Sequence, residues 1–229
     1  MEKAPKDFVT EVDLLCEELM VNAIEERYPD DAILSEERGG EISASGRTWL
    51  LDPVDGTANF ARANPIFCAC VSVIEGGSVT HAAVAAPRLG DLYHARSGGG
   101  AYKETGGRET PLRVSDTKRL EYAVAGADLS LHGGKPQDPG VERVLYRAWQ
   151  LRALGSAGIR GAWLAAGYLD VSVGTHNTAW DYAPTVLLVS EAGGRATDLS
   201  GEPWSLSSDG LIATNAALHN EILKTLHSA

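Results

Sequence analysis

The chain has 229 residues, a hydrophobic content of 44% and a formal net charge of −11 at pH 7. This length allows one large domain or two tightly joined small ones, and the apolar content can fill a core. The negative charge disfavours nucleic acid and anionic membranes as main partners, because phosphate-backbone binding depends on clustered Lys and Arg. No stretch free of charged residues exceeds twelve residues, which is too short to span a bilayer.

The cysteine content indicates the redox environment. Cys16, Cys68 and Cys70 are odd in number, and the last two lie in an apolar run. This pattern favours buried thiols in a reducing cytoplasm over disulfides or a metal clip.

The first third of the chain predicts a helix followed by strands. Residues 10–28 have the periodicity of an amphipathic helix, with Thr10 as a plausible N-cap. A short strand, 32–35, and a second strand, 48–51, follow, and each runs into acidic residues. The apolar stripe of the helix consists of Val12, Leu15, Leu19 and Ala23.

The rest of the chain alternates strands and helices. Residues 66–102 read as an antiparallel meander broken at Gly-rich turns. Such interleaving favours a layered α and β sandwich over a doubly wound parallel sheet. The further predicted elements are helices at 142–151 and 156–168, a helix ending at Gly193, a hairpin at 195–204, a strand at 211–215 and a last helix at 218–226.

The segment WLLDPVDGTANF, residues 49–60, is the main candidate for a site. Pro53 fixes the path of the chain after Asp52, and Gly56 permits a tight turn after Asp55, so that both carboxylates can face one point. The backbone N–H groups of Gly56 and Thr57 can lie at the N-terminus of a helix and donate hydrogen bonds to an anion. Hard oxygen ligands without a neighbouring His or Cys favour Mg²⁺ over zinc.

Both acidic motifs also have a purely structural interpretation. Asp52 and Asp55 belong to the residue types that form turns for local reasons. In WDYAPT, Asp181 stands where an N-cap would, with Pro184 in the first helical turn. Capping and metal binding are compatible, because a capping carboxylate is held rigidly at the helix start.

Taken in order, several motifs give the chain a family resemblance. The chain resembles the inositol monophosphatase family, within the larger group of Mg²⁺-dependent, lithium-sensitive phosphatases. The resemblance implies an α/β (α+β layered) fold, the αβαβα sandwich of the inositol monophosphatase and fructose-1,6-bisphosphatase type. It also implies a single catalytic domain, 1–229, with an N-terminal part to about residue 120 and a C-terminal part from 121. The motifs are DFVTEVD from Asp7, SEE, WLLDPVDGTANF, ARSGGGAY, GSAG, WDYAPTVLLVSEAGG and LIATN.

The resemblance implies a set of metal ligands. Glu36, Asp52 and the carbonyl oxygen of Val54 would bind one Mg²⁺, and Asp52, Asp55 and Asp181 a second, with a third ion left open. Two dications would neutralise four carboxylates, and an acidic protein could then accept a phosphate dianion.

The resemblance also implies catalytic roles. Asp13 and Thr57 match a pair that helps to activate the attacking water, together with Glu36. Asp13 has a second interpretation, because TEVD fits a capping box before an apolar run. Gly56 and Thr57 would hold the phosphate, beside Asp55.

Two further segments would meet the organic part of the substrate. One matches Gly155, Ser156 and Ala157, and the other is DVSVGTHNTAWD. Seven residues before Asp181, where inositol-specific enzymes carry a glutamate, this chain has Gly174. His176 is a candidate replacement, although a lone His is more often a surface or packed residue.

The beginning of the sequence differs from the resembling proteins, which usually carry about one more helical hairpin before DFVT. Here the sequence starts with MEKAP. Either the start is short, or a partner subunit supplies the covering helix. Because homodimers are common in the family, we expect a homodimer.

The expected activity is that of a Mg²⁺-dependent phosphomonoesterase in the cytoplasm. Its substrate would be a small phosphorylated polyol, sugar or amino alcohol, hydrolysed by two-metal activation of water. Alternatives on the same scaffold are a histidinol-phosphate phosphatase and a 3′-phosphonucleotide phosphatase. A non-catalytic regulatory relative is a third alternative, but a pure binding module has no need of four converging carboxylates.

Overall fold

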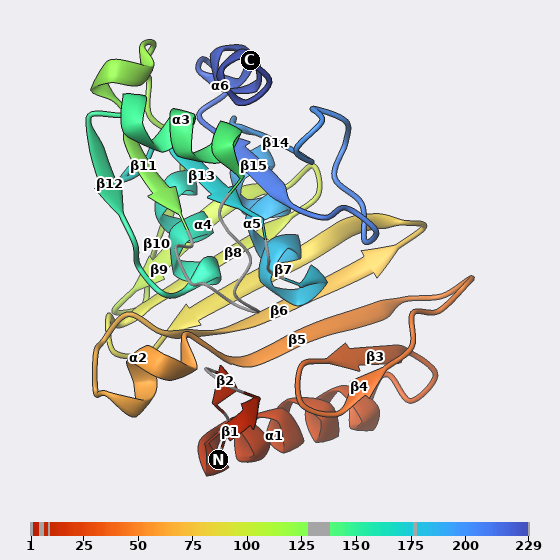
Figure 1. Ribbon diagram of the computed structural model, residues 1–229. Helices are drawn as coiled ribbons and strands as arrows, with labels where there is room; N and C mark the ends of the chain where they lie inside the picture. The colour runs from red at the N-terminus through yellow and green to blue at the C-terminus, as the bar shows by residue number, and fades with distance from the viewer. Residues whose placement is uncertain (1, 5–6, 9, 128–137, 176–177, 229) are drawn as a thin grey trace.

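The structure, a computed structural model, describes residues 2–4, 7–8, 10–127, 138–175 and 178–228. It has five layers, in the order α1, an eight-stranded sheet, α4 with α5, a five-stranded sheet, and α3 with α6 (Figure 1). The predicted αβαβα sandwich is therefore confirmed. The helices are α1 Glu11–Arg27, α2 Thr57–Ala61, α3 Pro139–Arg147, α4 Ala157–Ala165, α5 Ala179–Glu191 and α6 His219–Leu226, with the 3-10 helix η1 at Leu120–Tyr122.

The first sheet has the strand order β10-β9-β8-β7-β6-β5-β3-β4. In this sheet β3 and β5 pair in parallel, and all the other pairs of neighbouring strands are antiparallel. The predicted antiparallel meander from β6 to β9 is present. Its strands are β3 Ala32–Ser35, β4 Gly39–Gly40, β5 Thr48–Asp55, β6 Cys68–Glu75, β7 Ser78–Ala86, β8 Asp91–Arg96, β9 Gly100–Thr105 and β10 Arg108–Pro111.

The second sheet has the order β12-β11-β13-β15-β14. It corrects the predicted helix at 142–151, because residues 150–152 form a strand parallel to β11. The backbone of Ala148 is already extended, and this ends α3. The predicted hairpin at 195–204 is reduced to an isolated bridge between Thr197 and Pro203, since β14 pairs with β15 instead. The strands are β11 Val124–Ala127, β12 Gln150–Arg152, β13 Val171–Gly174, β14 Arg195–Thr197 and β15 Leu211–Thr214; β1 Glu2–Ala4 and β2 Asp7–Phe8 form a separate pair.

Helix α1 is present as predicted, but it packs through a different face. Val21 and Ile24 lie against Leu51 of β5 and are 3% and 7% exposed. The predicted apolar stripe faces away from the sheet: Leu15 is 56% exposed and Leu19 is 62% exposed. Hydrophobic periodicity located the helix but not the side that the sheet covers.

The central layer joins the two sheets. Ile159 and Leu164 of α4 and Leu188 of α5 are fully buried in the largest hydrophobic cluster. The two helices approach closely because Gly161 has no side chain; a Cβ there would lie 1.9 Å from Thr185 Oγ1. Each fully buried large apolar side chain stabilises the fold by about 1.5–3 kcal/mol.

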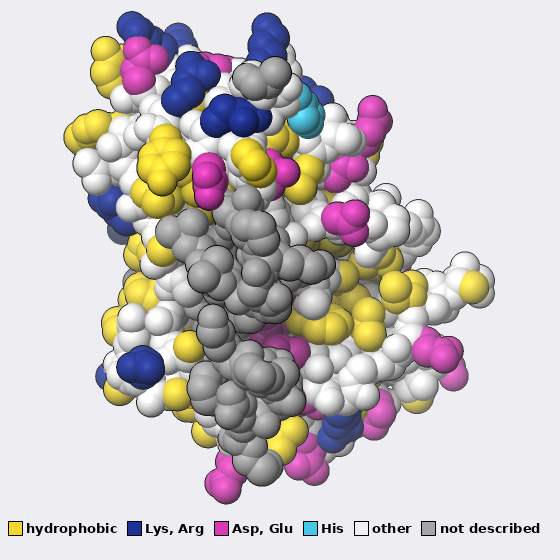
Figure 2. All heavy atoms as spheres, viewed as in Figure 1, with side chains coloured by type: hydrophobic (Ala, Val, Ile, Leu, Met, Phe, Trp, Pro, Cys, Tyr) yellow, Lys and Arg dark blue, Asp and Glu magenta, His cyan; other side chains and the backbone are white. Residues whose placement is uncertain are grey.

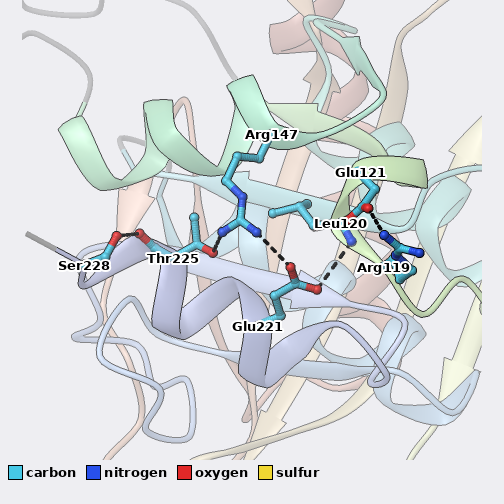
Figure 3. A network of polar contacts seen from close by, with 7 residues as sticks. All are labelled: Arg119, Leu120, Glu121, Arg147, Glu221, Thr225 and Ser228. Carbon is cyan, nitrogen blue, oxygen red and sulfur yellow. Dashed lines mark hydrogen bonds and ion pairs between the residues drawn. The ribbon is translucent and has the colours of Figure 1, made fainter.

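A polar network holds α6 against α3 and η1 (Figure 3). Arg147 donates to Thr225 Oγ1 at 2.7 Å and pairs with Glu221 at 3.1 Å. The other carboxylate oxygen of Glu221 accepts from the amide of Leu120. Directional bonds thereby fix α6 to α3 and η1, in addition to the apolar packing of this layer.

Charge is unevenly distributed on the face that Figure 2 shows. In Figure 2, several Lys and Arg side chains gather at the end of the molecule formed by α3 and α6, away from α1 and α2. Within the described ranges, no helix combines the length and the apolar character that crossing a bilayer requires.

Candidate active site

The acidic segment lies within β5, which continues past its predicted end to Asp55. Asp52 pairs with Cys70 and Asp55 with Cys68, so two residues of β5 stand opposite one residue of β6. Side chains three positions apart on a regular strand face opposite sides. This bulge changes the alternation, and both carboxylates can then face the same region.

Three carboxylates from distant parts of the chain converge here. Asp52, Asp55 and Asp181 each offer an oxygen atom, and these atoms lie within 4.8 Å of one another. Asp52 and Asp55 are buried, and Asp181 is partly exposed. The structure thus brings the start of α5 to the end of β5.

The electrostatics of this cluster are unfavourable without a cation. Burial raises the pKa of Asp52 well above its ordinary value, and the charges of Asp55, Asp181 and Glu36 raise it further. Burial, with the charge of Asp55, raises the pKa of Asp181 to about 6, against the hydrogen bonds from Thr178. A set of oxygen donors that repel one another fits a hard divalent cation, which would remove the repulsion.

The sequence suggested that Asp181 is the N-cap of α5, and the structure corrects this prediction. Thr178 is the N-cap, and Asp181 is the third helical residue of a capping box, accepting from Thr178 N at 2.7 Å and Thr178 Oγ1 at 2.9 Å. Pro184 lies in the second turn of the helix. The capping box fixes the carboxylate while leaving its other oxygen available.

Asp55 connects β5 to the start of α4. Its Oδ1 accepts from the amide of Ala157 at 2.9 Å, and its Oδ2 accepts from the amide of Gly158 at 2.7 Å. The hydroxyl of Ser156, the N-cap of α4, also donates to Oδ2. Ser156 and Ala157, predicted to contact substrate, are buried and hold this carboxylate. Their contact with substrate stays a prediction.

Gly56 occupies a position that requires glycine. Its φ is +92°, and a Cβ would lie 2.9 Å from the carbonyl oxygen of Gly155. The predicted tight turn is therefore present, and it brings α2 against the exposed Gly155. The first amides of α2 have no acceptor within the helix.

Thr57 and Asp13 are also brought together. Thr57 Oγ1 lies 3.4 Å from Asp13 Oδ1 and 3.1 Å from the carbonyl oxygen of Val54. The other oxygen of Asp13 accepts from Thr10 in a complete capping box at the start of α1. Both interpretations of Asp13 are therefore geometrically compatible.

Glu36 directly follows β3, and its amide donates to Leu51 O at 3.1 Å. Its charge acts on Asp52, although the three-carboxylate cluster does not include it. Sequence reasoning missed Glu17, which is 1% exposed and accepts from the amides of Glu37 and Arg38. Its spacing of four residues from Asp13 on one helix face was the available signal.

Gly174, where the resemblance places a glutamate in inositol-specific enzymes, packs closely against Tyr182. A Cβ at Gly174 would lie 2.6 Å from Tyr182 Cε1 and 2.7 Å from Tyr182 Oη. The tyrosine ring thus fills the space where a glutamate side chain would begin. His176 lies outside the described residues.

Comparison with known proteins places the chain in a family. The sequence profile of the inositol monophosphatase family matches residues 1–229. A fructose-1,6-bisphosphatase/inositol-1-monophosphatase of Thermotoga maritima is 34% identical over 97% of this chain and 83% of its own length. A histidinol-phosphatase of Mycobacterium tuberculosis is 32% identical, covering 96% and 85%, and the Nus factor SuhB of Pseudomonas aeruginosa is 34% identical, covering 98% and 84%.

Solved structures agree with this placement. The Thermotoga maritima IMPase superposes with a TM-score of 0.86 at 33% identity, over 98% of this chain and 85% of that one. The SuhB protein of Bartonella henselae gives 0.89 at 27% identity, over 100% and 88%. The profile match over the whole length, the relatives above 30% identity and the shared fold show that the chain belongs to the inositol monophosphatase family, a family of metal-dependent phosphoric monoester hydrolases.

Proposed function

We propose that the chain is a Mg²⁺-dependent phosphomonoesterase acting on a small phosphorylated polyol, sugar or amino alcohol. The observation that carries this proposal is the convergence of Asp52, Asp55 and Asp181 within 4.8 Å. Three acids at that separation, two of them buried, are costly unless a cation compensates their charges. The oxygen-only composition of the group favours Mg²⁺ over softer metals.

The proposed ligands are those that the family resemblance implies. Asp52, Asp55 and Asp181 would hold one ion, and Asp52 with Glu36 and the Val54 carbonyl oxygen a second, with a third left open. When bound, Mg²⁺ supplies Lewis-acid neutralisation of the phosphate charge and lowers the pKa of water. The capping box at Asp181 and the three donors on Asp55 keep these carboxylates oriented before any ion arrives.

The remaining residues move a proton and hold the phosphate. Thr57 Oγ1 lies between Asp13 Oδ1 and Val54 O, so it can accept the proton of an attacking water and pass its own to Asp13. The amides of Gly56 and Thr57 would donate to phosphoryl oxygens. Gly155 would line the side where the alcohol leaves.

The leaving alcohol distinguishes the candidate substrates. A ligand for ring hydroxyls is missing at Gly174, and Tyr182 fills its place, which argues against inositol phosphate as the preferred substrate. The Mycobacterium tuberculosis relative is named a histidinol-phosphatase, so histidinol phosphate is the second candidate. 3′-Phosphorylated nucleotides and fructose bisphosphate complete the set.

Phosphate release from this panel, with and without Mg²⁺, tests the proposal. We expect one substrate to be hydrolysed, only with Mg²⁺, and Asp181→Asn to be inactive. Asp181→Asn is a better control than Asp55→Asn, because Asp55 also anchors α4. Mg²⁺ binding without turnover of any substrate would refute the catalytic proposal and favour a regulatory relative.

We also propose a homodimer. The exposed stripe on α1, formed by Val12, Leu15 and Leu19, offers an apolar surface that a second copy would cover. Light scattering after size exclusion should give twice the chain mass, and Leu15→Glu with Leu19→Glu should give folded monomers whose Tm no longer depends on protein concentration. A monomeric wild-type protein would refute this proposal.

We propose that the enzyme is cytoplasmic. All three cysteines are free thiols, including the neighbouring Cys68 and Cys70. This is the state expected in a reducing compartment.

A further inference from the structure

A buried arginine that the proposed reaction does not use lies in the central layer, in the first half of α4. Arg160 is 2% exposed, and its Nε donates to Ser172 Oγ of β13 at 2.9 Å. Among the described residues, no carboxylate forms an ion pair with Arg160. A buried charge is costly unless an opposite charge compensates it. An arginine in this position therefore calls for an anion that the described part of the chain does not supply.

The neighbouring sheet makes room for this side chain. At Gly126 of β11, a Cβ would lie 2.8 Å from Cγ and 2.9 Å from Cδ of Arg160. Gly126 is the register partner of Ser172 in the parallel pairing of β11 with β13. Because Gly126 has no side chain, the aliphatic part of Arg160 can lie over β11 while its Nε reaches the Ser172 hydroxyl. The position of the guanidinium group is thus fixed by a glycine and by a directional bond.

Arg160 lies beside the carboxylate cluster. Ser156 and Ala157, which donate to Asp55, stand at the start of the same helix. Helical side chains lean toward the N-terminus of their helix, so Arg160 leans toward the end that meets Asp55. Burial raises the pKa of Asp181 to about 6, whereas the positive charge of Arg160 acts in the opposite direction. The guanidinium group is therefore near Asp181 without being paired with it.

The terminal nitrogen atoms of Arg160 can still be reached. In the described ranges, the residues with a fully buried side-chain nitrogen or oxygen that lacks a partner are Ser35, Ser72 and Trp204. Arg160 is not one of them, and only its Nε donates to another described residue. Its two Nη atoms therefore border accessible space, with N–H groups that can donate to a ligand.

We propose that Arg160 binds a second anionic group, a carboxylate or a further phosphate, on the organic part of the substrate. The inference rests on the proposed function, which assigns the reacting phosphate to the carboxylate cluster and its metal ions. A guanidinium group binds either anion through paired N–H···O bonds. Ser172 is then a positioning residue, because it contacts Arg160 and not the ligand. The site thereby favours phosphorylated acids and bisphosphates over monophosphates of neutral polyols, sugars and amino alcohols.

Phosphonates test this proposal without turnover, because their C–P bond is not an ester bond. Calorimetry with Mg²⁺ compares, over a series of chain lengths, phosphonates that end in a carboxylate with alkylphosphonates of equal length. We expect the full-length wild type to bind the phosphonocarboxylate about tenfold or more tightly at one chain length at least, as one charge-assisted contact implies. Arg160→Gln should bind both ligands equally. Arg160→Lys, which keeps the charge, should retain part of the preference, and it serves as the second variant if Arg160→Gln does not fold.

Arg195→Gln is the matched control, because it removes the same charge from an exposed position on β14 and should keep the full preference. Equal affinity of wild type for the two ligands at every chain length, or binding of neither, would overturn the proposal. An unchanged preference in Arg160→Gln would also overturn it, since that result is expected if Arg160 only offsets the charge of the acidic cluster. Phosphate release is measured separately. A protein that prefers phosphonocarboxylates but hydrolyses no ester would refute the catalytic proposal and support the role of Arg160.

Discussion

The role of Asp55 as an anchor between β5 and α4 gives a prediction about stability. Its two carboxylate oxygens accept from Ser156 Oγ, the amides of Ala157 and Gly158, and Cys68 Sγ. In Asp55→Asn one carboxylate oxygen becomes an amide NH₂ group. This NH₂ group then faces a backbone amide or the Ser156 hydroxyl, which is also a hydrogen-bond donor. Loss of a hydrogen bond to a charged group costs about 1.5–3 kcal/mol, and a buried donor left without an acceptor costs about 1–3 kcal/mol more.

Removing a charge from the cluster also relieves repulsion, so the comparison needs a variant with the same charge. Asp181→Asn removes one charge as well, but the asparagine oxygen can still accept both bonds from Thr178. We therefore expect Asp55→Asn to be less stable than Asp181→Asn by about 2.5–6 kcal/mol. Urea denaturation in EDTA, followed by tryptophan fluorescence, measures the difference. Equal stability of the two variants, to within about 0.5 kcal/mol, would refute the anchoring role.

Three further predictions concern metal binding, proton transfer and acid stability. Mg²⁺ should raise the Tm of wild type but not of Asp181→Asn, because the variant replaces a negatively charged ligand carboxylate with a neutral amide. An equal Mg²⁺-induced rise in Tm for both proteins, measured by calorimetry, would exclude Asp181 as a ligand. Thr57→Val should lower kcat by about 10²–10⁴-fold with Mg²⁺-induced stabilisation retained, since it removes only the hydroxyl between Asp13 and Val54, and unchanged turnover would contradict the proton route. Burial, with the charge of Arg195, lowers the pKa of His219 to about 4 from 6.5, so the unfolded chain binds a proton first as the pH falls. Wild type should therefore lose roughly 2–3 kcal/mol of unfolding free energy between pH 6.5 and 4 that His219→Gln does not lose. If the urea midpoints of the two proteins fell by the same amount from pH 7 to pH 4.5, this prediction would be wrong.

Local patterns in the sequence predicted features that depend on neighbouring residues. The capping box of Thr10 and Asp13, the turn at Gly56 and the meander from β6 to β9 all appear in the structure. Their hydrogen bonds and backbone angles form within a few residues or between adjacent strands, so the residue types suffice to indicate them.

Packing partners decided what local patterns could not. Residues 150–152 became β12 because β11 offered a parallel edge, although the local sequence favoured a helix. The buried side of α1 was set by β5, which takes the face with Val21 and Ile24 and leaves Leu15 and Leu19 exposed. Propensity is a weak prior that tertiary contacts override.

In the candidate site, too, some features were determined by the sequence and others only by the tertiary structure. The sequence alone determined which residues carry the acids, that they follow buried strands or open helices, and which family they belong to. Only the tertiary structure decided that Asp181 meets Asp52 and Asp55, and that Cys68, Cys70 and Gly158 surround Asp55. The reason is physical: these groups are separated by up to about 130 residues, and their contact depends on how α4 and α5 pack between the two sheets rather than on any local conformational preference.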